Sequence, residues 1–187
     1  MKRTAIILAL TAAVCCQAQN LVKNGDFQKV DKNGRLSGWY YKTENFTRVD
    51  SDQPGKTGEK AMVTKVTLPE GKQTLFSSLN QKITLGPGKY RLTFSAKVIG
   101  DGYANCSWGC FTADRKRIEL KKYWTPVCYG PEWKTITHEL VIPEGTSYIS
   151  LAVSGYLTSA RKHKEGSMYF SNIILIPAGN DQGAEKK

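Results

Sequence analysis

Aromatic side chains near residue 124 combine with turn signals in a way that could form a binding surface. Trp124 stands beside Tyr123 and two residues before Pro126, and aromatic residues in such a loop are often exposed. A flat ring can cover the apolar C–H face of a sugar, while amide, carboxylate and guanidinium groups bind the hydroxyl rim. Trp124 and Tyr123 are therefore candidate stacking residues for a carbohydrate.

Other aromatic residues have two open interpretations. Trp108 lies on an expected strand, where it belongs to the core if its face is buried and forms a stacking platform if its face is exposed. Tyr40 and Tyr41 are adjacent, so one of them must point outward and is a candidate for binding. Tyr103 and Tyr129 are weaker candidates.

A row of charged residues adjoins these aromatics. Arg117, Glu119 and Lys121 alternate along an expected strand and share one of its faces, which Tyr123 continues. Such a row is usually the solvated side of a sheet, but its position beside the rings makes Arg117 a candidate for binding sugar hydroxyls.

Signatures of catalysis are sparse. The sequence has no His-x-x-x-His, no Gly-x-Ser-x-Gly and no phosphate-binding loop. A glycosidase needs two carboxylates roughly 5–9 Å apart, and Glu44, Glu119 and Glu132 have no separation that the sequence can define. We therefore expect no enzymatic activity, with a small glycan-active enzyme as the less favoured alternative.

Three cysteines lie in the body of the chain. Cys106 and Cys110 would stand about 13 Å apart on one face of a strand, which is too far for a disulfide. Either could pair with Cys128, or all three could be buried small hydrophobic residues. His138 and His163 show no characteristic spacing to these cysteines, so no metal site is expected.

The first 18 residues are typical of a secretory signal peptide. Met1-Lys2-Arg3 is basic, Thr4 to Val14 is almost entirely apolar, and Cys16-Gln17-Ala18 resembles a cleavage site. The apolar run is shorter than the ~20 residues of a membrane span, so no transmembrane segment is expected. The protein is expected to be secreted, periplasmic or at the cell surface, and a lipid anchor on Cys15 or Cys16 is the alternative.

The charge balance bears on the partner. Lys and Arg number 27 against 16 Asp and Glu, giving a formal charge of +11 in 187 residues. This excess favours acidic glycans through long-range attraction, or it simply keeps the surface soluble. Export argues against nucleic acid as a partner.

Period-2 alternation dominates the chain after residue 19. The clearest strand is Lys89 to Val98, in which Tyr90, Leu92 and Phe94 begin an inward phase. Further strands are expected at 134–142, where His138 shares the inward face, at 147–155 and 168–176, and, from weaker patterns, at 61–67, 73–85, 103–112 and 117–124. Many short strands separated by Gly and Pro turns predict an all-β sandwich or barrel, spanning residues 19–177 and followed by a frayed tail at 178–187.

Four pieces of the sequence, in order, resemble one family. The first is Asn20-Leu-Val-Lys-Asn-Gly-Asp-Phe27 followed by Gly38-Trp39, and the second is the turn and strand from Gly86 to Val98. The third is Trp133 followed by Leu140-Val-Ile-Pro-Glu-Gly145, and the fourth is Tyr169-Phe-Ser-Asn-Ile-Ile-Leu175. These pieces are similar to segments of galactose-binding-like β-sandwiches. Carbohydrate-binding modules of bacterial glycanases are well-known members. The resemblance implies an antiparallel two-sheet jelly roll.

The resemblance also implies roles for single residues. It places Trp39 and Trp133 at positions that pack the core. It implies a structural calcium ion held by an acidic residue after the first Phe and an Asp in the closing strand, but Gln28 and Ser171 occupy those positions here. Calcium is therefore doubtful, although Asp26 and main-chain carbonyls offer oxygen ligands, and no other cofactor is expected.

We expect a secreted, non-catalytic carbohydrate-binding β-sandwich that holds an oligo- or polysaccharide by aromatic stacking and hydrogen bonds. The candidate binding residues are Trp108, Trp124, Tyr123, Tyr40, Tyr41 and Arg117. The alternative is a structural or adhesion module that binds a protein partner.

Overall fold

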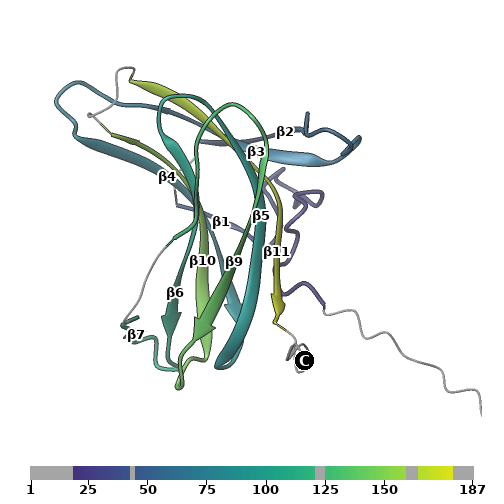
Figure 1. Ribbon diagram of the computed structural model, residues 1–187, viewed down its shortest axis with the longest axis vertical. Helices are drawn as coiled ribbons and strands as arrows, with labels where there is room; N and C mark the ends of the chain where they lie inside the picture. The colour runs from purple at the N-terminus through teal and green to yellow at the C-terminus, as the bar shows by residue number, and fades with distance from the viewer. Residues whose placement is uncertain (1–18, 43–44, 121–124, 159–163, 179–187) are drawn as a thin grey trace, which may run out of the picture.

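The chain folds into two antiparallel β-sheets packed face to face (Figure 1). The computed structural model describes residues 19–42, 45–120, 125–158 and 164–178. Within these ranges the regular elements are all strands, which confirms the all-β expectation. No helix in these ranges is long and apolar enough to cross a bilayer.

One sheet has six strands in the order β1-β4-β10-β6-β7, with β8 paired to β6. Its strands are β1 (Tyr40–Tyr41), β4 (Thr74–Thr84), β6 (Tyr103–Phe111), β7 (Arg117–Ile118), β8 (Val127–Cys128) and β10 (Tyr148–Thr158). The expected strand at 117–124 is thus much shorter than its alternation indicated. Its last four residues lie outside the described ranges.

The second sheet has five strands in the order β2-β3-β11-β5-β9. They are β2 (Phe46–Asp50), β3 (Lys60–Thr67), β5 (Gly88–Gly100), β9 (Lys134–Ile142) and β11 (Glu165–Pro177). The register between β11 and β5 shifts between Ser171 and Ile174, which marks a β-bulge.

The opening residues clamp this bulge. The side-chain oxygen of Asn20 accepts hydrogen bonds from the amides of Val22 (3.0 Å) and Leu175 (2.9 Å), and the Leu21 amide donates to the Leu175 carbonyl at 2.8 Å. A side chain at Gly25 would place its Cβ 2.0 Å from the Ile173 carbonyl oxygen, so the close approach requires glycine. These contacts explain the Asn-x-x-x-x-Gly spacing at the start of the domain.

The core lies between the sheets and is built from the inward phase of each long strand. Leu92, Phe94, Ala96 and Val98 of β5 are all buried, as the alternation predicted. Trp39 is also buried, with its ring 5.6 Å from that of Phe27, which confirms its core position. One face of each sheet is thereby buried in the core, and the other faces outward.

Candidate functional site

Trp108 belongs to the core. It alternates with outward residues along β6 and shares the inward face with Cys106 and Cys110. Its side chain is 6% exposed, and its ring lies 5.5 Å from that of His138, which faces inward as expected. The platform interpretation of Trp108 is therefore wrong, because a sugar cannot reach the face of a buried indole.

The two adjacent tyrosines point to opposite sides of β1. The Tyr41 ring packs against the core and its hydroxyl accepts a hydrogen bond from the Leu36 amide at 3.1 Å, so Tyr41 is structural. The guanidinium of Arg35 lies 4.9 Å from the centre of the same ring. Tyr40 is 70% exposed, and no aromatic ring or cation of the described residues stacks on its ring.

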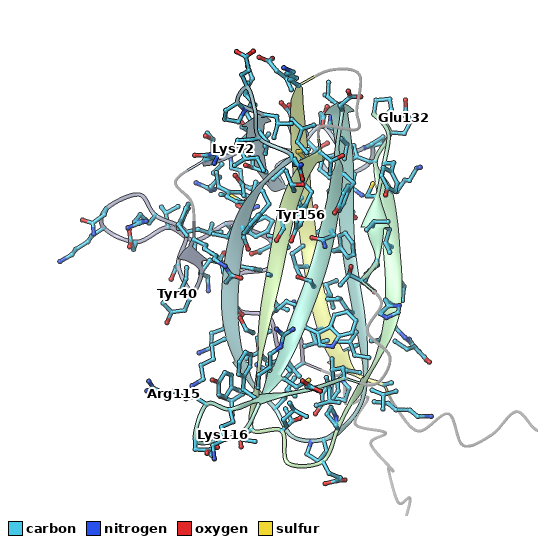
Figure 2. All side chains as sticks on the ribbon, turned by 90° about the vertical axis from the view of Figure 1, so that its left-hand side faces the viewer. Tyr40, Lys72, Arg115, Lys116, Glu132 and Tyr156 are labelled. Carbon is cyan, nitrogen blue, oxygen red and sulfur yellow. The ribbon has the colours of Figure 1, made fainter. Side chains whose placement is uncertain are left out.

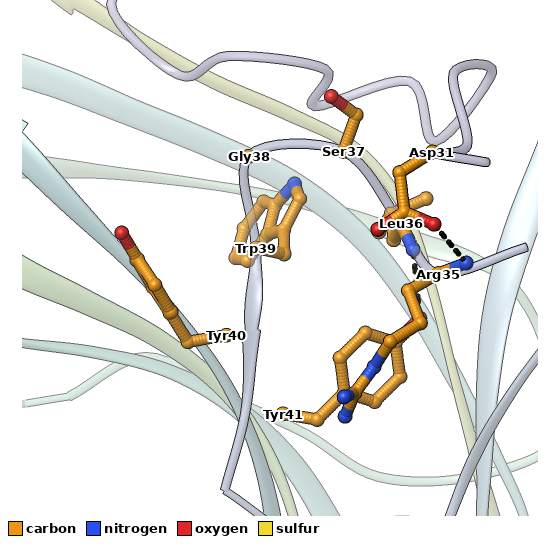
Figure 3. A pocket seen from close by; sticks show the side chains of 8 residues that line it. All are labelled: Asp31, Arg35, Leu36, Ser37, Gly38, Trp39, Tyr40 and Tyr41. Atoms are coloured by element: carbon orange, nitrogen blue, oxygen red, sulfur yellow. Dashed lines mark hydrogen bonds between the residues drawn. The ribbon is translucent and has the colours of Figure 1, made fainter. Parts of the chain in front are cut away.

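Tyr40 stands at the mouth of an open hollow of about 400 Å³ (Figure 3). Asp31 and Arg35 also line this hollow. The Asp31 amide donates to the Arg35 carbonyl at 2.7 Å, and the Arg35 amide donates to Asp31 Oδ1 at 2.9 Å. A ligand that contacts Tyr40 could therefore also enter this hollow.

Arg117, the remaining candidate that the structure describes, lies at the opposite edge of the six-stranded sheet. Arg117 is exposed in β7, where it pairs in register with Phe111. Together with Glu119 and Leu120 it lines a hollow of about 320 Å³. Tyr123 and Trp124 follow directly in sequence but lie outside the described residues, so their role stays a prediction.

Trp133 is not a core residue, in contrast to the expectation from the resemblance. It is partly exposed on the outer face of the five-stranded sheet, where its ring lies 6.4 Å from that of Tyr169. Its indole N–H donates to Asp52 Oδ1 at 2.8 Å, and the Lys97 ammonium lies 5.3 Å from its ring centre. Asp52 also pairs with Lys97, so this tryptophan helps to fasten the loop 51–59 across the sheet.

The outer face of the six-stranded sheet carries rings that sequence reasoning did not group together. Phe76, Tyr156, Tyr103 and Tyr129 form what we call the aromatic row. Consecutive ring centres in it lie 5.5, 5.0 and 5.7 Å apart. Phe76, Tyr156 and Tyr103 are cross-strand partners on β4, β10 and β6, and Tyr156 projects from this face in Figure 2. The inner rings of the row are covered by their neighbours on both sides.

A second ring pair lies at the other end of the same strands. Tyr148 and Phe111 are cross-strand partners and stack with centres 5.1 Å apart and planes inclined by 7°. Tyr148 and Tyr156 are separated by eight residues on β10, or about 27 Å at the rise of an antiparallel strand. The two groups of rings therefore leave a broad stretch of sheet between them.

Small residues fill this stretch. The register aligns Ser78, Ser154 and Asn105 in one rung, and Asn80, Ala152 and Ser107 in the next; we call these six residues the small-residue strip. Tyr40 pairs with Asn80 and so stands at the β1 end of the strip. The strip thus leads from the freely exposed ring of Tyr40 towards the edge formed by β7 and β8.

One atom beneath this face has no internal partner. Asn105 is 6% exposed, and its Oδ1 forms no hydrogen bond. Neighbouring positions are better satisfied, because Ser154 Oγ donates to Ser78 Oγ at 3.2 Å. A buried carbonyl oxygen without a donor carries a desolvation cost, and its burial keeps this atom out of reach of a ligand on the face.

The three cysteines are free and buried, so the disulfide alternatives with Cys128 are wrong. Burial raises the pKa of the Cys106, Cys110 and Cys128 thiols, which keeps them protonated and unreactive. Within the described ranges no three His, Cys, Asp or Glu side chains group closely enough to hold a metal ion.

Solved structures of low sequence identity share this two-sheet architecture. Tailspike protein 4 of bacteriophage CBA120 superposes with a TM-score of 0.61 at 15% identity over 84% of this chain, which spans 21% of that chain. TmCBM61, solved with β-1,4-galactotriose, gives 0.55 at 18% identity over 86% of this chain and 99% of its own. A family 16 carbohydrate-binding module superposes with a TM-score of 0.54 at 20% identity, over 84% of this chain and 99% of its own. The fold is a carbohydrate-binding-module-like β-sandwich. The sequence itself matches no protein-family model and no curated protein.

The calcium position of this type of sandwich has the wrong donors here. Ser171 Oγ donates to the Lys60 carbonyl at 3.3 Å, and Gln28 Nε2 donates to the Gly58 carbonyl at 3.4 Å. Asp26 accepts a hydrogen bond from the Gln28 amide at 3.4 Å. Calcium needs several oxygen ligands, carboxylates above all, whereas these side chains link the segments directly. The residues present therefore do not fit the ion.

Proposed function

We propose that this protein is a secreted, non-catalytic carbohydrate-binding protein that holds a glycan on the outer face of its six-stranded sheet. The observation that carries the proposal is the exposed, uncovered ring of Tyr40 at the end of the small-residue strip. Two similar sandwiches support it, since both are named as carbohydrate-binding modules and one of them was solved with a bound oligosaccharide.

Tyr40 provides the stacking surface in this proposal. A sugar ring lays its C–H face on a free aromatic face, which removes apolar surface from water. The inner rings of the aromatic row, Tyr156 and Tyr103, are covered on both sides, and the end rings Phe76 and Tyr129 are less exposed than Tyr40. Tyr40 is therefore the described aromatic residue best placed to stack on a saccharide.

The small-residue strip supplies hydrogen bonds to the next sugar units. Asn80 and Ser107 are partly exposed and carry an amide and a hydroxyl, and Ala152 between them leaves room for the chain. Such groups can donate to and accept from sugar hydroxyls. The glycan then crosses the strands from β1 towards Arg117, where Trp124 and Tyr123 are predicted to complete the site.

The chemistry of this sheet supports binding without catalysis. None of its six strands contains an Asp or a Glu residue. Glycoside hydrolysis generally uses two carboxylates that flank the bond to be broken. A sugar lying across these strands would meet hydroxyls, amides and rings instead.

The test is a binding survey with substitutions at Tyr40. The purified domain is titrated with a panel of soluble polysaccharides that includes β-1,4-galactan. Tyr40→Ala should weaken the binding of the best ligand by about 1–3 kcal/mol, roughly 5- to 150-fold, and Tyr40→Phe should retain most of it.

Val141→Ala is the matched control, because Val141 is 69% exposed on the opposite sheet. It should bind as the wild type does. Equal affinities of Tyr40→Ala and wild type, with both folded, would remove Tyr40 from the site. A panel without any ligand would count against glycan binding and favour the protein-partner alternative.

A further inference from the structure

The two outer faces of the sandwich differ in how their positive charges are balanced. On the five-stranded sheet, Asp50 pairs with Lys60 and Asp52 with Lys97. The six-stranded sheet has no carboxylate on any strand, so the cations of its outer face lack such partners there.

Lys82 is one of these cations. It is exposed on β4, in register with Ser150, and its ammonium lies 4.1 Å from the ring centre of Tyr148. The other face of Tyr148 is covered by Phe111, so the ring holds the ammonium at a fixed place beside the sheet. A cation–π contact leaves N–H groups of the ammonium available for an anion.

Lys42 repeats this arrangement near the other end of β4. Its backbone amide donates to the Ser78 carbonyl at 3.0 Å, and its ammonium lies 5.4 Å from the ring centre of Phe76 at the end of the aromatic row. Tyr40 lies between the two lysines along this edge, because it pairs with Asn80. A lysine ammonium that contacts an aromatic ring therefore lies on each side of Tyr40 along β4.

Arg117 adds a third cation at the far edge of the sheet. It is exposed beside Phe111, and Glu119 is the one carboxylate among the described residues that line the hollow next to it. A polymer that crosses from Tyr40 to β7 would meet positive charge at both edges of the sheet.

We propose that the ligand is an anionic polysaccharide whose carboxylate or sulfate groups bind Lys82 and Lys42 while its sugar rings pack on Tyr40. This inference rests on the proposed function, because it names the class of glycan that the same face selects. Neutral sugars gain nothing from the two ammonium groups, whereas a chain with repeated negative charges gains attraction at each.

The experiment compares polymers that differ in charge and share a backbone. Polygalacturonate is set against its fully methyl-esterified form, and dextran sulfate against dextran, so the two pairs separate carboxylate from sulfate recognition. The anionic member of at least one pair should bind more tightly, and raising NaCl from ~50 to ~200 mM should weaken that binding.

Substitutions locate the charge effect. Lys82→Gln and Lys42→Gln should each weaken binding of the anionic polymer about 2- to 5-fold, and the double variant about 5- to 20-fold. Lys65→Gln removes the same charge from an exposed position on β3 of the opposite sheet and should bind like the wild type.

The outcomes separate this inference from the proposed function. Equal binding of charged and uncharged members of both pairs would leave glycan binding standing and overturn anionic selectivity. A loss with Lys65→Gln as large as with Lys82→Gln would show that net charge acts from a distance, which also overturns the assignment to this face. No binding of any polymer, including β-1,4-galactan, would overturn the proposed function itself.

Discussion

Asp52 fastens the loop 51–59 to the outer face of the five-stranded sheet, and Asp52→Asn should measurably destabilise the fold. One carboxylate oxygen accepts from Lys97 and the other from the Trp133 indole at 2.8 Å. An asparagine has a single acceptor oxygen, so one of the two donors would lose its partner. The substitution also removes the only carboxylate that pairs with Lys97 among the described residues.

The magnitude follows from the unequal exposure of the pair. The Lys97 side chain is 8% exposed and the Asp52 side chain 68%. Removing a partner from a fully buried ion pair costs ~3–5 kcal/mol, and exposed pairs contribute ~0.2–1 kcal/mol. Water reaches Asp52, and the rings of Trp133 and Tyr169 continue to hold the ammonium, so we expect a loss of about 1–2 kcal/mol.

The loss should depend on pH. Hydrogen bonds from Lys97 and then from Trp133 lower the pKa of the Asp52 carboxyl below its ordinary value. A carboxyl group with a lowered pKa in the folded state stabilises the protein above its unfolded pKa of about 3.9, and this stabilisation disappears as the pH falls through the folded value. The difference between wild type and Asp52→Asn should therefore shrink below pH ~4.

Urea unfolding followed by circular dichroism at neutral and acid pH provides the assay. Asp114→Asn is the matched control, because Asp114 pairs with Lys116 at 3.0 Å and both side chains are well exposed. It should change stability little. Equal effects of the two substitutions at pH 7, or an Asp52→Asn effect that is unchanged at pH 3, would refute the reasoning.

Three further predictions concern the core and the metal position. Trp108→Ala should lower the free energy of unfolding by about 3–5 kcal/mol, measured by urea titration, because it empties a large buried site; a loss below 1 kcal/mol would contradict the burial. The three buried thiols should fail to react with a thiol reagent at pH 8 in the folded domain and react fully in urea, because burial raises their pKa. Calcium or a chelator should leave the melting temperature unchanged, because Gln28 and Ser171 replace carboxylates, and a calcium-dependent rise in a thermal melt would refute that.

The sequence predicts much of the sandwich because alternation reports which residues share a face. Strands β3, β4, β5, β6, β9, β10 and β11 coincide closely with the segments expected from that pattern. Alternation does not say which face is buried, and this is why Trp108 had two interpretations. The short strands β1, β2 and β8 carry too few residues for any period to emerge.

The arrangement of rings on the proposed binding face depends on the pairing of strands and cannot be read from any single strand. Tyr103 and Tyr156 become neighbours only through the register of β6 against β10, and that register is a property of the assembled sheet. The alternation of 147–155 places Tyr148 and Ile149 on opposite faces of the strand, and the structure shows that Ile149 faces the core. Its stacking partner Phe111 could not be found in the same way, because the two residues are far apart in the chain.

Trp133 shows how a resemblance can mislead about a single residue. Its position relative to the following hairpin matches the family, but the buried lysine Lys97 on β5 brings Asp52 and the indole together outside the core. Lys97 lies on the polar phase of its strand, so the alternation did not indicate that its ammonium would be buried among acceptors and aromatic rings.

The clamp of Asn20 on the bulge of β11 has a consequence for attachment. Leu21 and Leu175 are joined by a main-chain hydrogen bond, so the entry and exit of the domain are neighbours on the five-stranded sheet (Figure 1). A tether, a surface anchor or a fused catalytic unit at either end would then sit behind the sandwich. The face with Tyr40, on which we propose that a glycan binds, would stay turned outward while the domain is held in place.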